Sequence, residues 1–253
     1  DTLDAEIVRD AERFFSDGEK MQLSYAIRNT QRTVGTRTSS MIVQTFGMRN
    51  DLQPDHLTIR LTGNAGQSLG AFAAPGLKIE VVGDANDYVG KGLSGGIITV
   101  RPSMGSPLVE SDNTIIGNTV LYGATAGKLF AAGRAGERFA VRNSGAEAVI
   151  EGCGTNGCEY MTGGVAVILG RIGANFGAGM TGGMAWLYDP QGIASEYINH
   201  ETLVTCPVTQ PHWENRLREL IEAHQRETGS QRAAEILAHW AVEKAHFLQL
   251  CPR

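Results

Sequence analysis

The sequence has no excess of positive charge and no long apolar run. Its 22 lysine and arginine residues are outnumbered by 27 acidic residues, which leaves a net charge of −5, and no basic block interrupts the chain. Binding to nucleic acid or to an anionic membrane requires clustered Lys and Arg, so we expect neither. No apolar stretch approaches the roughly 20 residues of a membrane-spanning helix, and we find no signal peptide. We therefore predict a cytoplasmic location.

The chain is also poor in the residue patterns that build metal and catalytic centres. Four residues separate Cys153 from Cys158, and neither this pair nor Cys206 and Cys251 has the spacing of a disulfide framework or a zinc site. The histidines all lie outside residues 63–192, and no Ser-His-Asp or Cys-His set can be assembled from them: His56, His200, His212, His224, His239 and His246. We predict no catalytic, cofactor-binding or metal-binding residues in this chain.

Glycine is what the sequence has in abundance. Of 32 glycines, 28 fall within residues 63–192, where they recur as Gly-x-x-Gly-x-x-x-Gly between short apolar runs. Ile79, Ile98, Val149, Val167 and Trp186 mark the centres of five such runs. The step from Ile79 to Ile98 is 19 residues, that from Val149 to Val167 is 18 and that from Val167 to Trp186 is 19. Strand-length runs at a fixed period are typical of a solenoid, with glycine at the corners because it adopts positive φ. The pattern predicts a mainly β protein, a right-handed parallel β-helix of about six or seven coils.

The two ends differ from this repeat and predict caps. In residues 1–62 we expect a helix over residues 4–15 with Asp4 as N-cap, then a strand over residues 21–27, a second helix ending at Gly47, and a strand near residue 59. In residues 193–253 we expect two helices, the first beginning at Pro211 and ending at Gly229, the second capped by Ser230. The predicted division is therefore a cap, a β-helix over residues 63–192 and a helical tail that covers its other end.

Three local motifs suggest ligands but have simpler explanations. Residues 90–95 (GKGLSG) and 152–157 (GCGTNG) match the dinucleotide-binding fingerprint, which functions only where a helix follows it. A strand is predicted after the first copy, so we interpret both as corners. Residues 84–88 (DANDY) loosely match a calcium loop without its closing Glu, and a turn is the better interpretation.

Long phrases of the glycine region resemble one known family. The chain is similar to the C-terminal domain of the large subunit of glutamate synthase, and the similarity runs through nearly its whole length. The phrases that carry it are residues 63–72 (GNAGQSLGAF), 83–96 (GDANDYVGKGLSGG), 136–145 (GERFAVRNSG) and 157–164 (GCEYMTGG), with 29–30, 34–36, 220–222 and 228–230 outside the repeat.

This resemblance implies a function that the residues alone do not. It implies a β-helix domain without flavin, cluster or substrate of its own, which braces the amidotransferase and FMN-binding synthase domains and helps to hold the path of ammonia. The parent enzyme would convert glutamine, 2-oxoglutarate and reductant to two glutamate, using FMN, an iron–sulfur cluster and, through a small subunit, FAD and NADPH. The expected partners are those domains and the small subunit, in an oligomer.

Two alternatives remain open at this stage. The chain could be a stand-alone glycine-repeat subunit of a split enzyme of this kind, although its start at Asp1 rather than Met also suits an excised domain. A β-helix that binds carbohydrate is the alternative of another class. The role of one polar series stays undecided between internal ladders and an interface: Arg138, Arg142, Asn143, Glu151 and Glu159.

Overall fold

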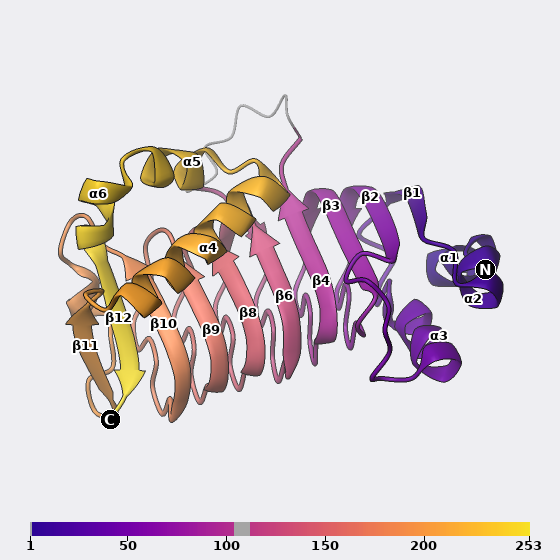
Figure 1. Ribbon diagram of the computed structural model, residues 1–253. Coiled ribbons are helices and arrows are strands. Elements are labelled where there is room, and N and C mark those ends of the chain that lie inside the picture. Colours follow the sequence, from indigo (N-terminus) through magenta and orange to yellow (C-terminus); the bar gives the residue numbers. More distant parts are fainter. Residues whose placement is uncertain (1, 104–111) are drawn as a thin grey trace.

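A sheet of twelve strands forms the centre of the molecule (Figure 1). The computed structural model describes residues 2–103 and 112–253. The strands lie in the order β1-β2-β3-β4-β6-β8-β9-β10-β12-β11, and β5 pairs with β3 and β7 beside this path. Their bounds are β1 Met21–Ile27, β2 Leu57–Ala65, β3 Leu77–Ala85, β4 Ser94–Arg101, β5 Thr114–Ile116, β6 Ala126–Ala131, β7 Arg134–Ala135, β8 Ser144–Ile150, β9 Thr162–Ile168, β10 Gly182–Tyr188, β11 Leu203–Pro207 and β12 Phe247–Pro252.

The prediction of a right-handed parallel β-helix is wrong. The strands form a mixed sheet, mostly parallel, with helices around it, in an α/β-like arrangement. The parallel pairing of successive repeats was predicted correctly, since β2 pairs in parallel with β3 and β8 with β9. The glycine phrases mostly form turns, as expected, and the departure from a β-helix lies in the helices around the sheet and in β12, which pairs antiparallel with both β10 and β11.

The turns between strands share an unusual backbone conformation. Arg138, Ala140 and Arg142 all have positive φ, between 56° and 58°. The N–H groups of Arg138 and Arg142 donate to carbonyls of the following turn, whereas that of Ala140 donates to the preceding turn. The same alternation recurs at residues 68, 70 and 72, at 88, 90 and 92, at 119, 121 and 123, and at 156, 158 and 160. Left-handed backbone costs roughly 1 kcal/mol or more per non-glycine residue, and hydrogen bonds between stacked turns offset that cost.

The N-terminal segment forms three helices beyond the edge strand β1: α1 (Leu3–Asp10), α2 (Glu12–Asp17) and α3 (Thr36–Phe46) (Figure 1). The predicted single helix is two, and Thr2 rather than Asp4 caps the first. The buried carboxylate of Asp4 instead accepts hydrogen bonds from Gly35, Arg37 and Thr38 at the start of α3. It therefore caps a helix more than thirty residues away in the sequence.

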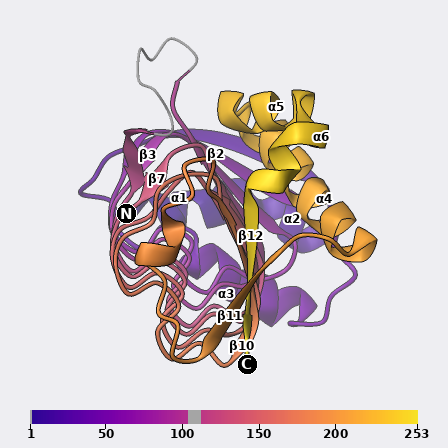
Figure 2. The ribbon, with the colours of Figure 1, turned by 90° about the vertical axis from the view of Figure 1, so that its left-hand side faces the viewer.

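The C-terminal helices cover a face of the sheet, and the prediction that they close its end is wrong. Helix α4 (Pro211–Thr228) crosses β4, β6, β8 and β9, and α5 (Gln231–Ala238) packs on α4 (Figures 1 and 2). Its predicted start at Pro211 and stop at Gly229, and the Ser230 cap of α5, are confirmed. Strands β12 and β11 extend the sheet at this end, and α6 (Trp240–Glu243) with the short helices η2 (Ala194–Glu196) and η3 (Lys244–His246) connects the remaining chain.

From β6 to β10 both faces of the sheet are buried, as is typical of parallel sheets. Alternate strand residues such as Leu129 and Ile150 face the large core between the sheet and the turns, whereas Phe130, Val149 and Trp186 face α4 and α5. No helix among the described residues is long and apolar enough to cross a membrane. The division at residues 62 and 192 stays a prediction.

Candidate functional site

The structure separates the polar series whose role the sequence left undecided. Arg138 and Arg142 are exposed in one turn, and Asn143 beside them is buried. The Asn143 side chain stabilises its own turn, because its amide donates to the Ala146 carbonyl at 2.9 Å and its oxygen accepts from the Ala146 N–H at 2.9 Å. Glu159 is half-buried in the next turn, where its carbonyl accepts from the Arg142 N–H. Asn143 thus acts locally, and the series does not form a single site.

Glu151, the fifth member, lies in a buried cluster that joins the tail to the sheet. It follows β8, and its side chain and that of His224 in α4 are both 0% exposed. His224 Nε2 lies 3.1 Å from Glu151 Oε1, and the Ser230 hydroxyl donates to the same oxygen. Ser230 also caps α5 through the Ala233 N–H. The contacts span 73 and 79 residues of sequence, so no local pattern could reveal them.

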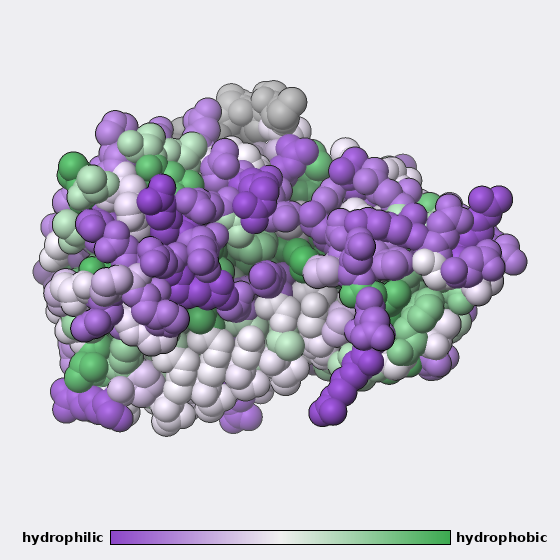
Figure 3. Space-filling view, in the orientation of Figure 1, coloured by the Kyte–Doolittle hydropathy of each residue, from purple (hydrophilic) through white to green (hydrophobic). Residues whose placement is uncertain are grey.

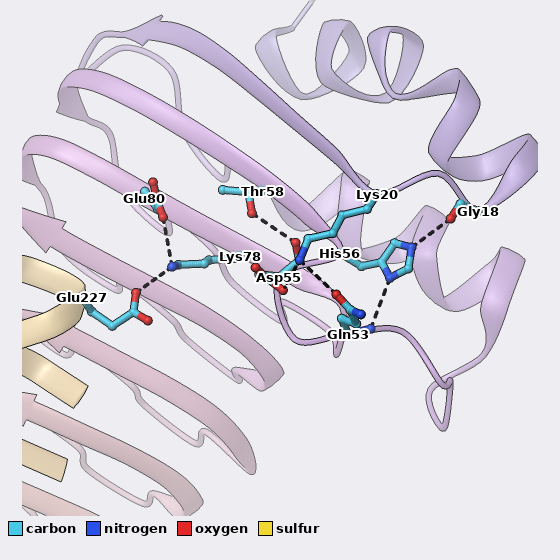
Figure 4. Close-up of polar contacts among 9 residues, drawn as sticks. All are labelled: Gly18, Lys20, Gln53, Asp55, His56, Thr58, Lys78, Glu80 and Glu227. Carbon is cyan, nitrogen blue, oxygen red and sulfur yellow. Dashed lines mark hydrogen bonds and ion pairs between the residues drawn. The ribbon is translucent and has the colours of Figure 1, made fainter. Parts of the chain in front are cut away.

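Ion pairs fix both ends of α4 on the sheet. Lys78 of β3 is 14% exposed and lies 2.6 Å from Glu227 Oε2 and 3.0 Å from Glu80 Oε1 (Figure 4). Burial alone would lower the pKa of Lys78, but the two carboxylates raise it above its ordinary value. Near the other end, Arg216 pairs with Glu147 of β8. Hydrophilic residues cover the outer side of the helix (Figure 3), so α4 is an amphipathic helix held by charge as well as by its apolar face.

A second polar cluster holds the segment that precedes β2 (Figure 4). Lys20 Nζ donates to Gln53 Oε1 at 3.0 Å and to Asp55 Oδ1 at 2.9 Å. This contact with Lys20 lowers the pKa of the Asp55 carboxyl. His56 Nε2 lies 2.9 Å from the carbonyl of Gly18, which ends α2. Lys20 and His56 both have hydrogen-bond partners within the chain. The cluster therefore stabilises the packing of the segment before β2 against the end of α2.

A pocket of about 370 Å³ lies at the carboxyl ends of β9 and β10. Three arginines line it, Arg134 of β7, Arg171 after β9 and Arg232 of α5, together with Tyr188 and Asp189. The Arg232 guanidinium lies over the Tyr188 ring, 5.9 Å from its centroid. We call this the arginine pocket. This pocket was not predicted from the sequence, because its three arginines lie far apart in the chain. Only Arg134 and Arg171 are related, through their positions in the glycine repeat.

The described residues do not fit a metal or cluster. They contain no group of three or more His, Cys, Asp or Glu side chains that could hold an ion. Cys153 and Cys158 are fully buried, and burial raises the pKa of the Cys153 thiol to about 12 and that of Cys158 well above its ordinary value. Thiolates are the metal-binding form of cysteine, so these two are poor ligands.

Neither glycine fingerprint opens a helix. Strand β4 begins at Ser94, within the first copy, and a turn that leads to β9 follows the second. A dinucleotide phosphate would need helix N–H groups at these points. Residues 152–157 lead into a turn and residues 90–95 combine a turn with the start of β4, and the absence of a dinucleotide site stays a prediction. Residues 84–88 likewise end β3 and enter a turn.

Comparison with known proteins adds what the geometry cannot give. The GXGXG motif family matches residues 4–253. The chain is 65% identical over all 253 residues to the glutamate synthase [NADPH] large chain of Azospirillum brasilense, of which it covers 17%. It is 49% identical over 229 residues to the ferredoxin-dependent glutamate synthase 2 of a Synechocystis species (15% of that protein), and 46% over 251 residues to the glutamate synthase [NADH] of Schizosaccharomyces pombe (12%). The chain thus spans less than a fifth of the length of these curated relatives.

Proposed function

The chain belongs to the GXGXG motif family and corresponds to the C-terminal region of glutamate synthase large subunits, and from this premise we propose that it is a structural, non-catalytic domain of a glutamate synthase. The observation that carries the proposal is the end-to-end match to one segment of a much longer enzyme. The relatives use different reductants by name, yet each contains this segment. A role common to all of them suits a brace better than a site for the electron donor.

The proposed whole enzyme converts glutamine, 2-oxoglutarate and reductant to two glutamate in the cytoplasm. FMN and an iron–sulfur cluster would reside in other domains, with NADPH and FAD in a small subunit. For the cluster, this proposal is supported by the described residues, which contain no group of three or more His, Cys, Asp or Glu side chains that could hold a metal ion. The proposed partners are the amidotransferase and FMN-binding domains, and the small subunit, in an oligomer. This chain would hold the amidotransferase and FMN-binding domains at a fixed separation, so that ammonia passes from one to the other without loss.

The architecture supports a rigid spacer. Consecutive turns are joined by backbone hydrogen bonds in both directions, as at Ala140 and Arg142, so one turn cannot shift without its neighbours. Helix α4 crosses four strands and is fixed by Glu227 near one end and Arg216 near the other. A sheet clamped in this way resists shear between strands.

The proposal is tested by the size and activity of the native protein. An antibody against an exposed turn, such as that around Arg138, is used to blot and to deplete a source lysate. We expect a band several times heavier than 27.1 kDa and depletion of glutamine-dependent glutamate formation. A band at 27.1 kDa whose removal still depletes the activity would indicate a separate subunit, and unchanged activity after complete depletion would refute the proposal.

A further inference from the structure

We propose that the arginine pocket is an oxyanion-binding site that recognises a carboxylate or phosphate group. The pocket lies at the carboxyl ends of parallel strands, where ligand sites of α/β sheets commonly form. Its volume of about 370 Å³ suits a small ligand or a single inserted side chain. The inference does not depend on the bracing role, since it concerns a ligand and not the stiffness of the sheet.

The first argument is that the pocket's positive charges have no acidic partner. Within residues 2–103 and 112–253, no ion pair or hydrogen bond engages the guanidinium of Arg134, Arg171 or Arg232. Arg134 and Arg232 are half-buried and Arg171 is exposed, whereas the half-buried Lys78 is paired with Glu80 and Glu227. Three guanidinium groups that face one space repel each other unless an anion lies between them.

The acids that line the pocket, Asp112 and Asp189, form no ion pair with these arginines among the described residues. Both carboxylate oxygens of Asp189 accept backbone N–H groups, Oδ1 from Ile193 at 3.1 Å and Oδ2 from Ala194 at 2.9 Å. Asp112 is exposed. Tyr188 directs its hydroxyl to Glu243 Oε2 at 2.5 Å, so the phenol is also engaged. The charged donors of the pocket are therefore those of its three arginines, beside the neutral side chains of Gln191 and Tyr197.

The second argument is that one donor is already withdrawn from water. Arg134 Nε is buried and has no hydrogen-bond partner among the described residues. Its side chain lies against the backbone of Gly152, where an added Cβ would be 3.0 Å from both Nε and Cγ. A buried N–H without a partner is costly, and an anion that reached Arg134 would recover that cost. Glycine at position 152 is what lets the arginine lie flat along the pocket wall.

Arginine chemistry defines the ligand class. The planar guanidinium fork donates two parallel N–H groups to a carboxylate or a phosphate, whereas neutral sugars offer no such match. The oxyanion could belong to a free metabolite or to an acidic side chain from elsewhere in the assembly. Both sources share the same chemistry, and the experiment separates them.

The test uses the complete polypeptide that carries this chain, with citrate and inorganic phosphate as probes in isothermal titration calorimetry. Arg171→Gln and Arg232→Gln each remove one pocket charge, and Arg49→Gln removes one exposed charge elsewhere as a matched control. If the ligand is a free anion, parent and Arg49→Gln bind a probe saturably, and the two pocket variants bind it about tenfold more weakly or worse. Equal affinity in all four proteins would overturn the proposal.

If the parent binds neither probe, melting temperatures decide the outcome. An acidic side chain that already occupies the pocket predicts lower melting temperatures for Arg171→Gln and Arg232→Gln than for Arg49→Gln, with a difference that shrinks as salt rises. Absence of probe binding together with equal melting temperatures in all variants would overturn the proposal in both forms.

Discussion

Three glycine-to-alanine substitutions separate two reasons for the abundance of glycine. At Gly163 an added Cβ would lie 2.2 Å from the Ser144 carbonyl oxygen, and the backbone is not in the left-handed region. At Gly123 the φ is +63°, but an added Cβ would meet nothing within 4 Å. Gly164 combines both conditions, with φ +79° and a Cβ 2.3 Å from the Ala146 carbonyl oxygen.

The magnitudes follow from these geometries. Left-handed backbone costs alanine about 1–2 kcal/mol, which is what we expect for Gly123→Ala. A Cβ that meets a backbone oxygen at 2.2 Å forces neighbouring strands apart, and overpacking of this kind costs about 1–3 kcal/mol or more, the expectation for Gly163→Ala. Gly164→Ala should approach the sum, roughly 2–5 kcal/mol, since the two costs arise at one residue from different atoms.

The assay is urea unfolding of the chain, followed by circular dichroism and compared at constant m-value. Thermal unfolding gives an independent ranking, because 1 kcal/mol corresponds to about 2–4 °C in a chain of this size. The reasoning is refuted if Gly163→Ala is neutral, or if Gly123→Ala destabilises as much as Gly164→Ala.

Three further predictions concern side chains. Asp4→Ala should lower the free energy of unfolding by about 2–3 kcal/mol, because the Asp4 carboxylate is a buried helix cap. Thr2→Ala should lower it by less than about 1 kcal/mol, because the Thr2 cap is exposed. Equal losses in urea unfolding would contradict this ranking. Burial alone would raise the pKa of the Glu80 carboxyl. The hydrogen bonds from Lys78 and Arg60 lower the pKa by more than burial raises it, so the pKa lies below the ordinary 4.5. Because the pKa of Glu80 is lower in the folded than in the unfolded protein, its ionised carboxylate stabilises the fold above the unfolded pKa, and this stabilisation is lost as the pH falls. The parent should therefore lose more stability than Glu80→Gln between about pH 5 and pH 3. Parallel pH–stability curves for the two proteins would exclude this linkage. Cys153 and Cys158 should resist iodoacetamide at pH 8 in the native protein, as mass spectrometry can show, and rapid alkylation would mean that they are not buried as described.

Local features of this fold could be predicted from the sequence because they depend on neighbouring residues. Alternation marks β1, Pro211 and Gly229 bound α4, and Ser230 caps α5. The period of the glycine region also indicates parallel pairing of successive strands correctly. In each of these cases hydrophobic spacing or backbone preference acts within a few residues.

The architecture and the site could not be predicted in this way because they depend on contacts across the chain. In the part of the chain that the structure describes, thirteen non-glycine residues have positive φ, among them Arg138 and Tyr160, and such residues give no sequence signal for this conformation. Strands β12 and β11 extend the sheet beyond β10 by antiparallel pairing between segments far apart in the sequence. The carboxylates of Asp4 and Glu151 find their partners more than thirty residues away.

The most direct test of the bracing role is the stoichiometry of the complete enzyme carrying Gly164→Ala, with Gly123→Ala as the control. Glutamine hydrolysed, glutamate formed and bound flavin are measured below the melting temperature of each variant. The account predicts that Gly164→Ala keeps its flavin and its glutamine hydrolysis but forms less glutamate for each glutamine hydrolysed, with free ammonia making up the difference. An unchanged ratio in a demonstrably loosened sheet, or loss of flavin with the ratio intact, would contradict it.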